Sequence, residues 1–320
     1  MNHTERLEHY RELCRESPDI PLFSKDWWLD AVCGKDNWDV ALVFQNDRLV
    51  GALPYYVIQR YGFRFIKKPL LTPHLFPYIR MDKQKNCIRQ IKFQQKIFKQ
   101  LIKNIPHFHY FDLHLHYDIK NWLPFYWAGF DQTTKYSFLI EDLSDINKIW
   151  ESMDKSARKN IRSAKKRLNV IEKYDMDLFF EINKQTYQKQ GINPPYSKEL
   201  LDRIVKFGLY HNAIKVLFAF DSDNRIHSVM MGGYDQHSLY MLAGSSDIQL
   251  RSSGAEYLLY WEMIRFASSM NLRFDFEGSM MENIEIRNRS FGAKQTQFFQ
   301  IKKVNSRLLR FYHFLLNEIH

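Results

Sequence analysis

Polar and apolar residues alternate along several short stretches of the chain, a pattern that predicts β-strands. In the first half these stretches are residues 39–44, 48–60, 109–116 and 133–141. Apolar residues that recur every three or four positions instead predict helices. These helices are expected near residues 5–15, 25–32, 85–104 and 120–128. The first half is therefore a mixture of helices and strands that ends close to residue 141.

The first two predicted strands are joined by Gln45-Asn46-Asp47, which is typical of a hairpin turn. Further on, Pro69, Pro73 and Pro77 follow one another at intervals of four residues. Proline lacks the backbone N–H donor and is not tolerated inside a regular helix. We therefore expect an irregular loop over residues 65–79.

A single apolar stripe predicts a long helix at the start of the second half. The stripe consists of Trp150, Met153, Ala157, Ile161, Ala164 and Leu168. The remaining faces carry Lys155, Arg158, Lys159, Arg162, Lys165, Lys166 and Arg167. Residues 153–173 contain eight basic and two acidic residues, the most concentrated positive charge in the chain. Partners that bear phosphate groups would benefit from this charge.

The remainder of the second half predicts three antiparallel strands in series, followed by an alternation of helices and strands. A short strand at 168–174 and helices near 177–189 and 197–208 come first. The three strands are expected at 213–220, 225–235 and 237–246. The alternation then continues with a helix at 254–270, a strand at 272–279, a helix at 281–291, a strand at 295–303 and a helix at 306–319.

The composition is that of a globular protein, with 45% hydrophobic and 26% charged residues, which excludes a disordered or collagen-like chain. Basic residues outnumber acidic ones by 46 to 36, and 16% of the residues are aromatic. This combination leaves two classes open, a nucleic-acid-binding protein and an enzyme with anionic ligands.

Several other classes are not expected. Cys14, Cys33 and Cys87 are far apart, so neither a disulfide framework nor a structural zinc site is predicted. His114 and His116 alternate with Asp112 on one predicted strand, but no further ligand cluster accompanies them, and we expect no metal. The chain has neither an apolar signal-peptide core nor about 20 consecutive apolar residues, so we expect a soluble, cytoplasmic protein.

The junction between the third strand of the series and the next helix reads Gln249-Leu250-Arg251-Ser252-Ser253-Gly254-Ala255. This stretch resembles the coenzyme A loop of the GNAT acyltransferases, with Ser252 where that family's first glycine is expected. In the family, backbone N–H groups at the start of the helix face the pyrophosphate. The resemblance implies a binding site for the donor at Leu242, Gly244, Ser245, Gln249, Arg251, Ser252, Ser253, Gly254 and Ala255. Alternatively, Ser253-Gly254 only caps the helix.

Residues 274–303 resemble the C-terminal signature of the Fem-type peptidoglycan-bridge transferases and their acetyltransferase relatives. Asp275, Phe276, Gly278 and Ser279 match the first part of this signature, and Glu277 stands in its variable place. The second part is matched by Arg289, Ser290, Phe291, Gly292 and Lys294. Residues 154–166 are similar to the basic helix that opens the second domain of these proteins.

This resemblance implies an α/β (α+β) chain of two tandem GNAT-like domains, each a mixed, largely antiparallel sheet flanked by helices. The domains are expected at residues 1–141 and 142–320, with the last helix packing on its own core, on the first domain, or against a membrane surface. It further implies transfer of an acyl or aminoacyl group to an amine. The donor is acyl-CoA, such as acetyl-CoA, or aminoacyl-tRNA. The preserved loop favours acyl-CoA.

Glu277 and Lys294 are the candidate catalytic residues. Glu277, at the end of its strand, would accept a proton or clamp the amine; otherwise it pairs with Arg273 or Arg287. Lys294 would neutralise an oxyanion or a diphosphate; otherwise it is a surface lysine. Ser279 is expected to cap the next helix in a capping box with Glu282. The candidates for binding a phosphorylated substrate are Arg158, Arg162, Arg287 and Arg289, although the last two also suit a solvated helix end.

The leading hypothesis is an N-acyltransferase that acts on an amine, in the metabolism of cell-envelope precursors. Its alternatives are an aminoacyl-tRNA-dependent Fem-type transferase and a non-catalytic protein that binds RNA or a precursor. The expected partners are an anionic donor and an amine acceptor, with tRNA and a membrane or lipid-linked precursor as further candidates. The sequence defines no oligomeric state.

Overall fold

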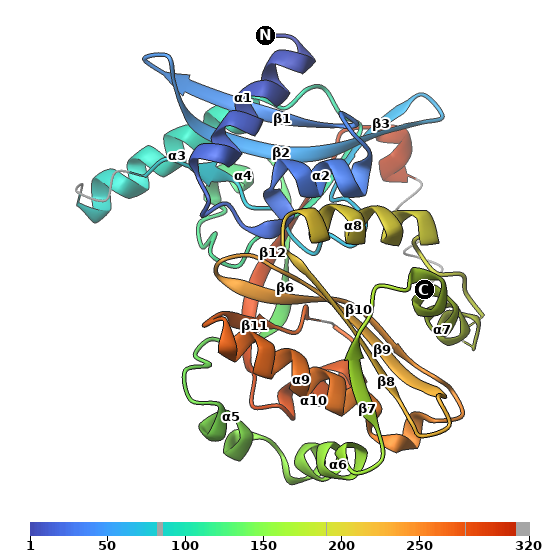
Figure 1. The fold of residues 1–320 in the computed structure, drawn as a ribbon. Coiled ribbons are helices and arrows are strands. Elements are labelled where there is room, and N and C mark those ends of the chain that lie inside the picture. The colour runs from blue at the N-terminus through green and yellow to red at the C-terminus, as the bar shows by residue number, and fades with distance from the viewer. Residues whose placement is uncertain (82–85, 190, 279, 312–320) are drawn as a thin grey trace. The chain divides into compact units, whose positions relative to one another are not determined.

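The structure of the chain is a computed structural model that describes residues 1–81, 86–189, 191–278 and 280–311. It has two compact units (Figure 1). Unit 1 consists of Met1–Lys135 and Gln297–His320, and unit 2 of Tyr136–Thr296. The sequence predicted two domains that are divided after residue 141. Compact units are not the same as independent domains, so this division stays a prediction. None of the described helices combines the length and apolar character that crossing a bilayer requires.

Unit 1 is built on the strand order β1-β2-β3-β5-β12, with β4 paired to β2. Its helical elements are α1 (His3–Glu16), η1 (Leu22–Ser24), α2 (Asp26–Cys33), α3 (Cys87–Asn104) and α4 (Leu123–Trp127). Its strands are β1 (Trp38–Gln45), β2 (Arg48–Arg60), β3 (Phe63–Lys67), β4 (Tyr78–Ile79) and β5 (Tyr110–Leu115). The strands β6 (Asp131–Ile140) and β12 (Lys294–Val304) have residues in both units.

The hairpin predicted at the start of unit 1 is confirmed. β1 and β2 pair antiparallel, and Gln45 lies opposite Arg48. Asn46 and Asp47 between them both have positive φ, 48° and 60°. This is the backbone of the two-residue turns that match the twist of the flanking strands, and Asn and Asp tolerate it better than most residues.

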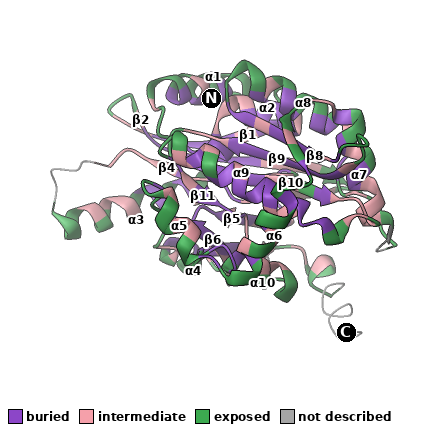
Figure 2. Ribbon diagram, turned by 60° about the horizontal axis from the view of Figure 1, so that its bottom comes forward, coloured by how far each residue is buried: buried purple, intermediate pink, exposed green. Residues whose placement is uncertain are grey.

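Unit 2 has the strand order β6-β11-β10-β9-β8-β7. Its strands are β7 (Asn169–Glu172), β8 (Ile214–Phe220), β9 (Ile226–Tyr234), β10 (Ser238–Ser246) and β11 (Arg273–Asp275). Its helical elements are α5 (Ile146–Ser152), α6 (Lys155–Lys165), α7 (Met176–Lys189), α8 (Lys198–Tyr210), η2 (Arg251–Ser253), α9 (Ala255–Ser269) and α10 (Glu282–Arg289). The buried face of α9 packs on β8, β9 and β10, and α7 contacts the other face of β9 and β10 (Figures 1 and 2).

Two predicted elements of unit 2 are wrong in extent. The single helix expected over 150–168 is two helices, because Met153 and Asp154 are extended and the N–H of Asp154 donates to the carbonyl of Ser290 at 2.9 Å. The strand expected over 272–279 ends at Asp275. Beyond it, the N–H of Phe276 donates to the carbonyl of Phe138 on β6. The chain therefore follows β6 and leaves β10.

Two further predictions concern the segments after β11 and β12. Helix α10 begins at Glu282 with Met281 as its N-cap residue, so the capping box predicted from Ser279 is wrong; Ser279 itself lies outside the described residues. Residues 307–311 of the predicted last helix are helical, and residues 312–319 lie outside the described part of the chain.

Candidate functional site

The strands β10 and β11 of unit 2 run parallel and then diverge. Their pairing covers only Ser238 with Arg273, Leu239 with Phe274, and Tyr240 with Asp275. β10 continues to Ser246, whereas β11 ends at Asp275. In the described part of the chain, no strand pairs with this edge of β10 beyond Tyr240. Backbone N–H and C=O groups at such an edge are available to an extended ligand.

A β-bulge lies just beyond the last pair. Met241 is opposite Gly232 and Ala243 is opposite Met231, so Leu242 is the extra residue. A bulge bends the strand and re-aims the groups next to it. Of the donor-binding residues predicted on β10, Leu242 is half-buried, Gly244 is exposed and Ser245 is buried.

The loop after β10 turns directly into helix α9. The carboxylate of Asp247 accepts the N–H groups of Gln249 and Leu250 at 2.8 and 3.2 Å, which closes the turn. Arg251, Ser252 and Ser253 form the short helix η2. Gln249, Arg251 and Ser252 are exposed, so the side chain of Ser252 faces solvent.

Gly254 is the N-cap residue of α9, and glycine is required there for two reasons. Its φ is +79°, which places it in the left-handed region. A Cβ atom would also lie 2.7 Å from the carbonyl oxygen of Asn160 on α6. The next residue, Ala255, is buried, and its N–H donates to Ser253 Oγ at 3.3 Å.

Helix α6 therefore lies against the start of α9, and it brings its positive charge with it. Residues 155–167 contain seven basic and no acidic residues. Arg167 donates to the carbonyl of Ser253 at 3.3 Å. Arg158 is half-buried, and Arg162 is exposed with its guanidinium 5.4 Å from the centre of the Trp150 ring. An anion at the first turn of α9 would experience the field of these cations.

Two predicted arginines on α10 are engaged by protein groups. Arg287 donates to Glu256, in the first turn of α9, at 2.5 Å and lies 4.8 Å from the centre of the Tyr260 ring. Arg289 is exposed and forms an ion pair with Glu285, one turn earlier, at 2.9 Å. The arrangement of Arg287 fixes α10 against α9 and neutralises a carboxylate at the helix start.

A buried carboxylate stands where β10 and β11 separate. Asp275 is fully buried, and its Oδ1 accepts the hydroxyl of Ser137 and the N–H of Glu277. Burial raises the pKa of Asp275 to about 6, although both hydrogen bonds oppose the shift. Glu277 follows with a positive φ of 52° and one carboxylate oxygen withdrawn from solvent.

The turn after α10 holds an aromatic cluster. Phe291 is fully buried and stacks on Tyr257, with ring centres 5.5 Å apart. Gly292 ends the helix with a φ of +79°. Lys294 is exposed and lines a cavity of about 450 Å³ in unit 2, together with Glu141, Asp142, Asp145, Lys148 and others.

Residues 155–282 match the family model described as an acetyltransferase (GNAT) domain. This segment holds the diverging strands, the bulge, the loop of Gly254 and α9. Residues 155–282 are a GNAT acetyltransferase domain. The prediction of an acyltransferase is confirmed at this level.

No curated protein matches the chain. Among solved structures, FemX is similar to it, with a TM-score of 0.65 and 11% identity over 93% of this chain and 96% of FemX. The C-terminal domain of a putative lysylphosphatidylglycerol synthetase from Agrobacterium fabrum has a TM-score of 0.55 and 9% identity, over 94% and 92%. A tandem GNAT protein from the clavulanic acid biosynthesis pathway has a TM-score of 0.52 and 8% identity, over 94% and 95%. These likenesses concern the fold, and they confirm the predicted mixed α/β class.

The loop of the GNAT domain has a pattern in the sequence, whereas the groups that surround it were not predicted. Asp275 entered only as a motif residue, although a carboxylate between two phenylalanines at a strand end was a signal of its burial. Ser137, its partner, lies 138 residues away and no local pattern points to it. Arg167 was counted only as part of a basic face, and its contact with Ser253 depends on the packing of α6.

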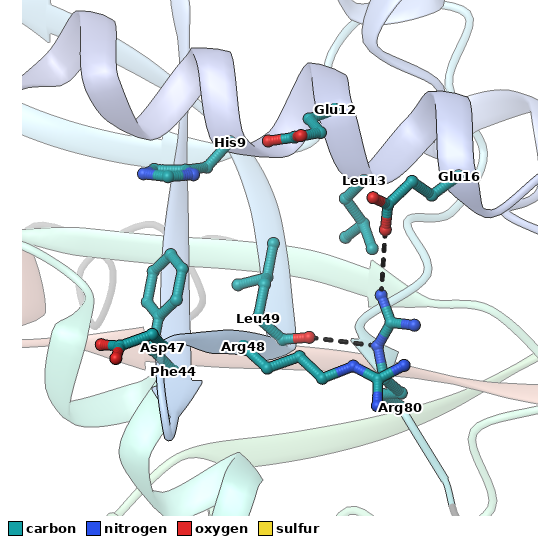
Figure 3. A pocket seen from close by; sticks show the side chains of 9 residues that line it. All are labelled: His9, Glu12, Leu13, Glu16, Phe44, Asp47, Arg48, Leu49 and Arg80. Carbon is teal, nitrogen blue, oxygen red and sulfur yellow. Dashed lines mark hydrogen bonds and ion pairs between the residues drawn. The ribbon is translucent and has the colours of Figure 1, made fainter.

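Unit 1 has a pocket of its own, which no prediction anticipated. It has a volume of about 350 Å³ and lies between α1 and the β1–β2 hairpin (Figure 3). The guanidinium group of Arg80 in this pocket already has protein partners. It forms an ion pair with Glu16 at 3.4 Å and donates to the carbonyl of Leu49 at 3.2 Å. With Glu12 and Asp47 also on its wall, the pocket does not favour an anion.

Proposed function

We propose that the chain transfers an acyl group from a coenzyme A thioester to an amine, and that the working site lies in unit 2. The observation that carries the proposal is the divergence of β10 from β11 immediately before a glycine-capped helix. This combination offers an extended backbone edge for the pantetheine arm and helix N–H groups for the pyrophosphate. The fold, a GNAT domain over residues 155–282, supports it.

The donor would bind along Leu242, Gly244 and Ser245 and then at Gln249, Arg251, Ser252, Ser253, Gly254 and Ala255. The exposure of Ser252 supports this arrangement, because its side chain points to solvent. The cations of α6, Arg158 and Arg162 among them, would add long-range attraction for the phosphates.

The reaction requires a neutral amine whose nitrogen attacks the thioester carbonyl carbon. The carbon–sulfur bond then breaks, the amine loses a proton and the thiolate leaves or is protonated. Backbone N–H groups at the bulge of Leu242 are our candidates to stabilise the oxyanion. Glu277 remains the candidate proton acceptor, and Lys294, Arg287 and Arg289 the candidates for the acceptor side. The engagement of Arg287 by Glu256 favours a structural role for that residue.

A second candidate donor is aminoacyl-tRNA. The observation that favours it is the seven basic residues between 155 and 167, which lie against the start of α9 and exceed what a small anion needs. The acceptor would then be a cell-envelope precursor, and the reaction would take place in the cytoplasm. The likeness to FemX is compatible with both donors.

The test compares the two donors on the whole chain. Acetyl-CoA at about 100 times its Kd should raise the free energy of unfolding by about 2.7 kcal/mol, and the thermal midpoint with it. Aminoacyl-tRNA, at matched ionic strength, is the second arm. Amine acylation is then followed by mass spectrometry with a panel of amines. A shift with tRNA alone would favour the second donor, and no shift with either would overturn the proposal.

A further inference from the structure

Helix α3 of unit 1 carries a continuous stripe of positive charge. Arg89, Lys92, Lys96, Lys99 and Lys103 recur every three or four residues, so they share one face of the helix. All five are exposed, and the opposite face buries Ile97, Phe98 and Leu101. Residues 86–111 contain no acidic residue. The charge of the stripe is therefore not compensated along the helix.

Exposed apolar side chains of α4 lie beside this stripe. Leu123 is 43% exposed, Tyr126 60% and Trp127 51%. Phe98 and Phe125 hold the two helices together, with ring centres 5.7 Å apart. Lys99 Nζ lies 4.8 Å from the centre of the Trp127 ring. The lysines and the α4 side chains thus form one surface, which we call the α3–α4 face. Its members are Arg89, Lys92, Lys96, Lys99, Lys103, Leu123, Tyr126 and Trp127.

Helix α3 also extends outward from the sheet of unit 1, with its N-terminal turns exposed (Figures 1 and 2). Ile88, 66% exposed, precedes Lys92 by four residues and lies on the same side. Trp and Tyr are the side chains enriched at membrane–water interfaces, where one end of the ring is apolar and the other is wet. Lysines next to them bury their methylene chains and hold the ammonium groups at the level of the headgroups.

We propose that the α3–α4 face docks unit 1 on a lipid surface that contains anionic headgroups. The five cations of α3 supply the attraction for the headgroups, and Leu123, Tyr126 and Trp127 enter the interfacial layer. The proposal does not depend on acyl transfer, because no residue of this face belongs to the GNAT domain. It makes the chain a peripheral membrane protein that binds through unit 1.

Other occupants fit the face less well. A second copy of the chain would bring five cations opposite five cations. RNA would use the cations and would stack on Tyr126 and Trp127, but it would gain nothing from exposed Ile88 and Leu123. Helix α6 provides the contrast within the chain. It has as many cations, but its neighbouring aromatic residue, Trp150, is half-buried against Trp261 with ring centres 4.9 Å apart.

The experiment is vesicle flotation of the whole chain. Vesicles of phosphatidylcholine with about one third phosphatidylglycerol are compared with pure phosphatidylcholine, at low and high salt. We expect binding to the anionic vesicles and at least a tenfold loss when Lys92, Lys96, Lys99 and Lys103 are all replaced by Gln. The matched control replaces Lys155, Lys159 and Lys165 of α6 and its C-cap residue Lys166 by Gln, which removes the same charge elsewhere. It should retain most of the binding.

The apolar part of the face has its own readout. Brominated lipids should quench the tryptophan fluorescence of the bound protein, and Trp127→Phe should remove most of this quenching. Equal losses from the α3 and α6 variants would mean attraction by net charge alone and would overturn the proposal. It would also be overturned if the α3 variant still floated, or if the face bound RNA and no vesicles. Circular dichroism of each variant verifies that these exposed substitutions leave the fold intact.

Discussion

Among the described residues, each unit contains a pair of parallel strands, and the two pairs end differently. In unit 1, β3 and β5 pair from Phe65 with Tyr110 to Lys67 with Asp112. The chain beyond β3 continues along the edge of β5. The N–H of Leu75 donates to the backbone carbonyl of His114 at 2.8 Å, and the carbonyl of Leu75 accepts the N–H of His116 at 2.9 Å. The proline-containing segment therefore closes this edge.

In unit 2, the segment that follows β11 does not pair with the corresponding edge of β10. After Tyr240 and Asp275 the two strands separate, and β10 leads into the loop that Gly254 ends. A parallel pair alone therefore does not make a ligand site. The segment that follows it decides whether the edge is paired internally or remains available to a ligand. This difference is our reason for assigning the proposed chemistry to unit 2.

The largest expected effect concerns the closed edge of unit 1, where His74 is buried and His114 is half-buried. Burial lowers the pKa of His74 to about 3 and that of His114 to about 4. The unfolded chain binds these protons near pH 6.5, so the folded state loses stability as the pH falls below that value. We expect a loss of about 3 kcal/mol for each histidine between pH 7 and 4.

Urea unfolding at pH 7, 5.5 and 4 measures this loss. In His114→Gln one titrating group is missing, so its free energy of unfolding should fall less steeply with pH than that of the natural chain. Parallel pH profiles for the two proteins would contradict the account of the closed edge.

The next effect concerns the open edge of unit 2. Gly254→Ala places a Cβ atom against the carbonyl of Asn160 in a backbone conformation that alanine disfavours. We expect a destabilisation of about 3 kcal/mol and a loss of acetyl-CoA binding. Gly62→Ala in unit 1 is the control, because Gly62 has a φ of +75° with open space around it. It should cost only about 1 kcal/mol. Equal losses of unfolding free energy in the two variants would mean that α6 shifts at Asn160 to make room for the Cβ atom.

A smaller effect distinguishes the units by its sign. The pKa of Asp275 is raised above that of the unfolded chain, so protonation stabilises the folded state as the pH falls through about 6. Between pH 7 and 4 the natural chain should gain about 2 kcal/mol relative to Asp275→Asn. The measured quantity is the difference in unfolding free energy between the two proteins at each pH. A difference that does not change with pH would mean that Asp275 is not buried as a carboxylic acid.

The sequence predicted the elements of both units better than their ends. β2 begins and ends at the predicted residues because alternation and a two-residue turn are local signals. The break between α5 and α6 was missed, since it depends on a bond between Asp154 and Ser290, far apart in the chain. β11 is shorter than predicted because the N–H of Phe276 pairs with the carbonyl of Phe138 on β6, a residue far away in the chain.

Only the part of the candidate site that has a local sequence motif could be predicted. The loop around Gly254 has a sequence pattern, so it could be named in advance. The difference between the two strand edges has none, because it depends on whether residues 68–75 return to β5 and whether the chain after Asp275 follows β6. Both are pairings between segments that no spacing rule connects.

The smallest expected effect tests what Arg287 does at the open edge. If it fixes α10 on α9 through Glu256, Arg287→Gln and Glu256→Gln should each cost about 1 kcal/mol, and the double variant less than their sum. A double-mutant cycle on unfolding free energies measures this coupling. If Arg287 instead binds the acceptor, Arg287→Gln should raise the acceptor KM while Glu256→Gln leaves it unchanged. The first outcome would mean that Arg287 is the counter-ion of Glu256 at the start of α9. The start of α3 in unit 1 has no acidic residue in its first turn and therefore needs no such counter-ion.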